Sequence, residues 1–200
     1  MSRHKKNQRG FTIIETMAAI IVLTIGLVGL AVLMSNMMTG GARSRYMSNA
    51  AMLASEELES LQRYSATAPE VAVTSGTTAG SLTSDVTASV TSGGSTATVD
   101  YFDTVQLSSI GGSISETYSG KDSSGNTNYT TQTHSPNGQM SASTSSTAPT
   151  PTADTLIFKR RWIIEKDAPV VGVRRITVLV TLTNPAVTKA VNFQMSTVRP

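Results

Sequence analysis

Residues 10–34 read GFTIIETMAAIIVLTIGLVGLAVLM, and Glu15 is the only charged residue in the apolar run 11–34. At a helical rise of about 1.5 Å per residue, this run is about 36 Å long, which exceeds a hydrocarbon core of about 30 Å. The stretch therefore predicts one membrane-spanning helix. Its basic flank, Arg3, Lys5, Lys6 and Arg9, predicts a cytoplasmic N-terminus and an exported remainder.

The same pattern is also typical of a secretory signal peptide or a plain signal anchor. Three observations argue against that interpretation. The run is long for a signal peptide, and Met34-Ser35-Asn36-Met37 is a poor cleavage site. A small residue, Gly10, precedes the run instead of following it, so a peptidase that cuts there leaves the helix attached. Glu15 is costly inside a membrane, by about 2.5–3.5 kcal/mol on insertion scales, and so needs a partner or a purpose.

The segment Gly10-Phe11-Thr12-Ile13-Ile14-Glu15 resembles the class III signal of type IV prepilins and pseudopilins. The resemblance implies that prepilin peptidase cleaves after Gly10 and methylates the new N-terminal Phe11. It also implies that Glu15 is the assembly glutamate of the family. The apolar helix would anchor the chain in the membrane before assembly and form the filament core afterwards.

Elementary electrostatics gives Glu15 a role that agrees with this resemblance. A helix N-terminus carries unpaired N–H groups and partial positive charge, and cleavage would add an α-amino group at Phe11. In a bundle of such helices, a carboxylate of one subunit that meets the terminal amine of the next would replace two buried charges with one pair. That pairing would set the axial register. The alternative is a protonated Glu15 tolerated near the membrane interface.

Two further segments resemble a narrower group within the prepilin and pseudopilin family. The run Ile25-Gly26-Leu27-Val28-Gly29-Leu30 and the segment 51–59 look like those of PilV-type minor pilins and the related GspI-type pseudopilins. Val32 stands where major pilins usually carry a proline, which disfavours the bulk filament subunit. Gly26 and Gly29 are candidates for close helix packing, although glycine is common in membrane helices.

Beyond Gly40-Gly41, a candidate flexible point, residues 41–64 predict the amphipathic half of a two-part helix. Apolar residues recur there at spacings of three and four residues, which predicts one apolar stripe that packs on a globular head. The stripe consists of Met47, Ala51, Ala54, Leu58 and Leu61.

The exported region 65–155 is rich in Ser, Thr, Gly and Ala, which leaves few side chains for a core. Alternation at 97–102 and 104–107 predicts short strands, whereas 121–128 and 132–153 predict loop or disorder. The Ser/Thr content is a weak signal for O-glycosylation, and the sequon at Asn128 is a weak signal for N-glycosylation.

Residues 156–200 predict three antiparallel strands near 156–165, 176–183 and 187–195, separated by proline-containing breaks. The fold class is therefore α+β. A long N-terminal helix, transmembrane and then amphipathic, packs against a small C-terminal antiparallel β-sheet, as the type IV pilin resemblance also implies.

The composition argues against an enzyme. Only 14% of the 200 residues are charged, cysteine is absent, and the two histidines, His4 and His134, lie in the basic flank and in a low-complexity stretch. No catalytic constellation, metal-ligand spacing or cofactor motif is found. Four arginines at 160, 161, 174 and 175 could form a basic patch for nucleic acid. We expect them instead to offset acids of this chain or of neighbouring subunits, because residues 65–154 carry seven acids and one lysine, a net charge of −6. Aromatic residues are also too few for base stacking.

The resulting hypothesis is a PilV-like minor pilin that enters a type IV pilus and contributes to assembly initiation or to tip properties. The alternatives are a GspI-like pseudopilin of a type II secretion system and a signal-anchored surface protein that never polymerises. Expected partners are prepilin peptidase, other pilin subunits, the inner-membrane assembly platform and the lipid bilayer. The location is the bacterial inner membrane with a periplasmic head, and then the pilus or pseudopilus. The predicted segments are a leader 1–10, an assembly helix 11–40, the amphipathic half 41–64, a variable region 65–155 and the head sheet 156–200.

Overall fold

A computed structural model describes residues 12–121, 124–152, 154–183 and 190–200 of the chain. The chain divides into two compact units, Met1–Ala42 and Arg43–Pro200. The leader residues, including Gly10 and Phe11, lie outside the described residues.

One helix, α1 (Ile13–Arg63), accounts for all the described helix. Its bounds agree with the prediction of a two-part helix over 11–64, and it stays helical through Gly40 and Gly41. Straight-chain residues and alanine, which favour helix, dominate its second half, and no proline interrupts it.

The second unit contains the ten described strands, and every pair among them is antiparallel. The strands are β1 (Thr78–Gly80), β2 (Thr87–Ser92), β3 (Ser95–Asp100), β4 (Phe102–Ile110), β5 (Ser113–Lys121), β6 (Thr127–His134), β7 (Met140–Ser145), β8 (Leu156–Lys166), β9 (Arg174–Leu182) and β10 (Asn192–Arg199).

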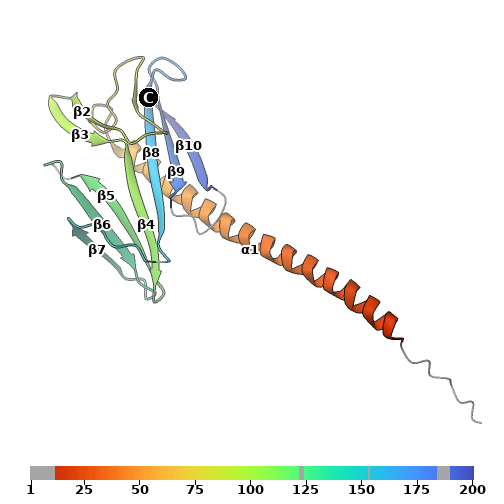
Figure 1. The fold of residues 1–200 in the computed structure, drawn as a ribbon. Helices are drawn as coiled ribbons and strands as arrows, with labels where there is room; N and C mark the ends of the chain where they lie inside the picture. Colours follow the sequence, from red (N-terminus) through yellow and green to blue (C-terminus); the bar gives the residue numbers. More distant parts are fainter. Residues whose placement is uncertain (1–11, 122–123, 153, 184–189) are drawn as a thin grey trace, which may run out of the picture. The chain divides into compact units, whose positions relative to one another are not determined.

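Eight strands form one sheet in the order β10-β9-β8-β4-β5-β6-β7, with β1 also paired to β8 (Figure 1). β2 and β3 form a separate hairpin. The centre of the sheet is the pair β4–β8, in which Asp103 lies opposite Arg160. Because β4 and β8 are distant in sequence, this pairing joins the Ser/Thr-rich region to the C-terminal strands in one sheet.

The α+β fold class, a long helix with an antiparallel sheet, is confirmed. Two details of the prediction are wrong. Residues 121–128 and 132–153 were expected to be loop or disorder, but β5 ends at Lys121, β6 spans Thr127–His134 and β7 occupies Met140–Ser145. The strand expected near 187–195 instead begins at Asn192 and ends at Arg199. The described sheet is therefore larger than a three-stranded meander, because hydroxyl side chains can extend a sheet without supplying a core, as Thr117 and Thr131 do through a 2.8 Å cross-strand hydrogen bond.

The core of the second unit lies between the C-terminal half of α1 and the sheet. In β8, alternate side chains are buried, among them Phe158, Trp162 and Ile164, as the period of two predicts. The helix contributes Ala54, Leu58 and Leu61 of the predicted stripe, together with Ala50 and Leu53. Met47 is only partly buried against this cluster.

The end of α1 is held by the last described strand. Arg199 of β10 donates from Nη1 to the carbonyl oxygens of Leu61, Gln62 and Tyr64 at 2.9–3.3 Å. The last carbonyls of a helix have no partner within the helix, and a cation is favourable beside them. This contact fixes where the helix stops against the sheet.

Candidate functional site

The first turn of α1 is capped by Thr12. The amide of Glu15 donates to the carbonyl oxygen of Thr12 at 3.1 Å and to its Oγ1 at 3.3 Å, which satisfies a free N–H of the helix start. Thr12 and Glu15 stand at the spacing of a capping box, Ser/Thr-x-x-Glu. Glu15 therefore lies in the first turn, where the helix dipole favours a negative charge.

The surface around Glu15 is apolar on all sides. Every large apolar side chain from Ile13 to Met38 is more than half exposed within the chain. The hydroxyls of Thr16 and Thr24 do not disturb this surface, because they donate to the carbonyls of Ile13 and Ile21 at 2.7 and 2.8 Å. By length and composition α1 can cross a membrane, and no residue of its most apolar window is buried in the chain.

The carboxylate of Glu15 forms no hydrogen bond or ion pair with any other residue that the structure describes. Gly26 and Gly29 are equally unengaged, since a Cβ built on either would meet nothing within 4 Å. Packing at these glycines and pairing at Glu15 thus depend on molecules other than this chain, and both stay predictions. Gly10 and Phe11, the predicted cleavage and methylation residues, lie outside the described residues.

The second unit contains a buried charge cluster that the sequence analysis did not find. Arg160 of β8 is only 4% exposed and donates from Nε to Asp103 Oδ1 at 2.8 Å, while its Nη2 bonds the other carboxylate oxygen. The same Nη2 lies 3.1 Å from Glu57 Oε2 of α1, and Nη1 donates to the carbonyl of Leu53 at 3.4 Å. One guanidinium therefore joins the helix to two central strands.

The electrostatics of this cluster follow from its burial. Burial raises the pKa of Glu57 to about 7, an effect that Arg160 opposes and Asp103 reinforces. Burial alone would lower the pKa of Arg160, but the carboxylates of Asp103 and Glu57 outweigh it and hold that pKa above its ordinary value. Arg160 is thus a permanent cation, and Glu57 titrates near neutral pH.

Tyr118 of β5 extends the cluster toward solvent. Its hydroxyl donates to Glu116 at 2.7 Å and lies 3.1 Å from both carboxylate oxygens of Glu56. Its ring lies 5.2 Å from the guanidinium carbon of Arg160, a cation–π distance. Burial and the two carboxylates raise the pKa of Tyr118 well above its usual range, so the hydroxyl stays a donor.

The predicted role of the other arginines is confirmed for two of them. Arg161 pairs with Asp85 at 2.8 Å, and Arg175 pairs with Glu165 at 2.6 Å. Arg174 instead donates to the carbonyl of Val71 at 3.3 Å. With Arg160 buried, these residues do not form a free basic patch. The sequence gives no signal that Glu57 is buried, because the nearby glutamates of the same helix, Glu56 and Glu59, are exposed.

Comparison with known protein families matches residues 5–31 to the prokaryotic N-terminal methylation motif. No curated protein and no solved structure matches the chain. The match covers Gly10, Phe11, Glu15, Gly26 and Gly29, and it supports a type IV pilin-like family of prepilin-processed proteins. Such motif-bearing chains are structural subunits and not enzymes, and a membrane-capable apolar helix fits a membrane-anchored pilin.

Proposed function

We propose that this chain is a minor pilin of the PilV type that enters a type IV pilus after prepilin peptidase has removed residues 1–10. One observation carries the proposal. Within the methylation motif, an exposed carboxylate on the first turn of α1 stands alone in a helix surface that is otherwise apolar.

The chemistry of that surface explains why the chain would polymerise. A helix that is apolar on all sides is stable in lipid or among other such helices. The free energies of the two environments differ only a little. In either place an unpaired carboxylate is costly. A methylated α-amine at Phe11 of a neighbouring subunit would supply the missing cation and favour the filament over the bilayer.

The second unit would then be the exported head. Its helix-to-sheet contacts at Leu53, Leu58 and Arg160 lie within the chain and leave the apolar half of α1 available for assembly. Prepilin peptidase, other pilin subunits and the inner-membrane assembly platform are the partners that this function requires.

The test is Glu15→Ala in cells that assemble pili, with Glu59→Ala as the matched control. Glu59 is an exposed glutamate of the same helix, outside the motif. We expect Glu15→Ala to remain in the membrane fraction and to disappear from sheared pili, whereas Glu59→Ala behaves as wild type. Glu15→Gln separates charge from polarity. If Glu15 acts in its protonated form, the glutamine variant should still enter sheared pili.

Wild-type amounts of the Glu15→Ala chain in sheared pili would contradict the assembly role. Absence of the wild-type chain from sheared pili, together with dependence of protein secretion on it, would instead identify the GspI-like pseudopilin. A chain that functions at the surface without entering any filament would be the signal-anchored protein.

A further inference from the structure

Two exposed arginines of α1 are not used by the proposed assembly role. Neither Arg43 nor Arg45 forms a hydrogen bond or ion pair with any other residue that the structure describes. They are also the only charged residues of α1 between Glu15 and Glu56. Two unpaired cations therefore mark one level along a helix that is otherwise uncharged over this stretch.

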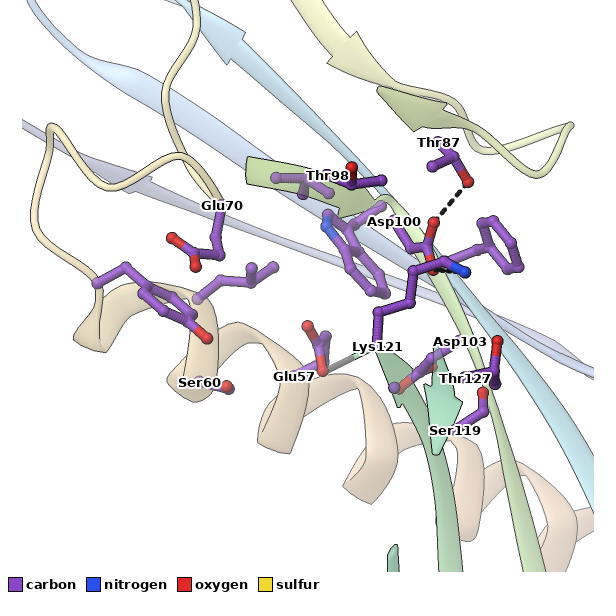
Figure 2. A pocket seen from close by; sticks show the side chains of 16 residues that line it. Glu57, Ser60, Glu70, Thr87, Thr98, Asp100, Asp103, Ser119, Lys121 and Thr127 are labelled. Atoms are coloured by element: carbon purple, nitrogen blue, oxygen red, sulfur yellow. Dashed lines mark hydrogen bonds and ion pairs between the residues drawn. The ribbon is translucent and has the colours of Figure 1, made fainter. Parts of the chain in front are cut away.

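The acids closest to these arginines in the second half of α1, Glu56 and Glu57, have other partners. Glu57 and Asp103 line one cavity of the second unit (Figure 2), where both contact a buried arginine of β8. Glu56 accepts from a tyrosine hydroxyl of β5 at 3.1 Å. It also stands eleven residues beyond Arg45, a helical rise of about 16 Å. These acids of the helix therefore do not neutralise Arg43 and Arg45.

The level of the arginines matches the surface of a bilayer. Arg43 stands 28 residues beyond Glu15, which at about 1.5 Å per residue is a helical rise of about 42 Å. A bilayer measures about 40–45 Å when its headgroups are included. With Glu15 at the cytoplasmic surface, Arg43 and Arg45 lie among the headgroups of the exported leaflet.

The geometry of a helix lets the two side chains reach headgroups on different sides. Residues two apart on an α-helix point in directions about 200° apart, so Arg43 and Arg45 lie on opposite sides of α1. Long side chains of a helix lean toward its N-terminus, which here is the apolar end. An arginine can cover apolar surface with its stem while its guanidinium stays in the polar layer. The guanidinium binds a phosphate through two parallel N–H groups.

The sign of the charge selects the lipid class. A zwitterionic headgroup carries its own ammonium, which competes for the phosphate, whereas an anionic headgroup carries no such cation. Basic residues on an exported flank are also disfavoured, because positive charge prefers the cytoplasmic side, so a pair retained there needs a compensating anion. We propose that Arg43 and Arg45 bind the phosphates of anionic phospholipids in the exported leaflet and so fix the depth of the anchored chain. The proposal rests on the membrane-anchored state of the proposed function and not on entry into a pilus.

Native mass spectrometry of the full chain tests this proposal. The protein in a non-ionic detergent is incubated with equal amounts of phosphatidylglycerol and phosphatidylcholine, and the lipids that it retains are counted. Arg43→Gln, Arg45→Gln and the double variant are compared with Arg63→Gln, which removes an exposed arginine at the last residue of the same helix. Inorganic phosphate is the soluble competitor, and circular dichroism checks that all variants keep the wild-type helix content.

We expect the wild-type chain to retain phosphatidylglycerol in preference to phosphatidylcholine. Each single variant should lower this preference by about fivefold, the value of one basic residue beside an anionic surface. The double variant should retain both lipids equally, and Arg63→Gln should behave as wild type. Equal retention of the two lipids by the wild-type chain would overturn the proposal, as would a preference that survives in the double variant. Displacement of the lipid by inorganic phosphate would identify a site for free phosphate instead.

The competing anion is a carboxylate of a neighbouring subunit. Equal retention of the two lipids, together with loss of the double variant from sheared pili, would assign Arg43 and Arg45 to that contact. Glu15→Ala should keep the wild-type lipid preference even where it fails to enter pili. The lipid proposal and the proposed function therefore fail separately.

Discussion

The two halves of α1 differ in where their apolar and charged side chains find partners. Leu23 in the first half is 61% exposed, whereas Leu53 in the second half is fully buried against the sheet. Glu15 and Glu57 show the same contrast for charge, since Glu15 has no partner among the described residues and Glu57 contacts Arg160.

The two halves therefore obtain their stability from different partners. Residues 43–63 bury one face within the chain, including Leu53 and Glu57, so the packing of that face is a property of this sequence alone. The first half exposes a continuous apolar surface and must obtain its partners from lipid or from other subunits.

Replacing Arg160 should damage the second unit most. Arg160→Met leaves Glu57 and Asp103 buried without their cation, and loss of one partner from a buried charge cluster costs about 3–5 kcal/mol. The measurement is urea unfolding of the full chain in micelles, followed by Trp162 fluorescence. Arg161→Met, which breaks the more exposed pair with Asp85, should cost about 1 kcal/mol or less. Equal effects of the two variants would contradict the buried cluster.

A leucine pair on α1 tests the division between its halves directly. Leu53→Ala removes a fully buried side chain and should lower the free energy of unfolding by about 3 kcal/mol. Leu23→Ala makes the same chemical change on an exposed surface and should leave that free energy unchanged. Both are read from the same urea curves, and a Leu23 effect as large as the Leu53 effect would show that the first half packs on its own chain.

Stability should fall as pH rises from about 5 to 8. The pKa of Glu57 is about 7 when folded and near 4.5 when unfolded, so the folded state holds a proton that the unfolded state has lost. The stabilisation is complete below about pH 4.5 and is lost as pH passes 7, a change of about 2–3 kcal/mol. The neighbouring charges are Arg160, which stays cationic, Asp103 and Glu56.

Urea midpoints at several pH values provide the measurement, and Glu57→Gln provides the control. Glutamine cannot ionise, so its curve should be nearly flat over this range. The lowered pKa values of Asp85 and Glu165 give the opposite slope, but at more acidic pH. A wild-type slope that survives in Glu57→Gln would assign the titration to another group.

The smallest expected effect is at the start of α1. Thr12→Ala removes the side-chain acceptor for the Glu15 amide and should destabilise the first turn by about 1 kcal/mol. Amide hydrogen exchange at Glu15 should then quicken in micelles, while the urea midpoint of the second unit stays constant. Thr24→Ala, whose hydroxyl bonds only its own helix, is the comparison and should leave the Glu15 amide unaffected.

The sequence predicts the molecule well where periodicity is strong. The ends of α1 and the strands β8 and β9 follow from apolar spacing, and the stripe residues Ala54, Leu58 and Leu61 are buried as predicted. β7 was not predicted, because its segment Met140–Ser145 has no apolar alternation and is held by pairing with β6. The Glu57–Arg160–Asp103 cluster could not be predicted either, since three separate elements meet only through the β4–β8 pairing and the docked helix.

The candidate assembly residues were found from the sequence for a different reason. Gly10, Phe11 and Glu15 form a local motif whose spacing is read directly, and residues 5–31 match the methylation motif.

Cleavage after Gly10 is tested most directly by the intact mass of the protein extracted from membranes of cells with and without prepilin peptidase. We expect a chain that begins at N-methylated Phe11 only when the peptidase is present. A chain that begins at Met1 or Ser2 in both strains, or one that begins after residue 34, would contradict it.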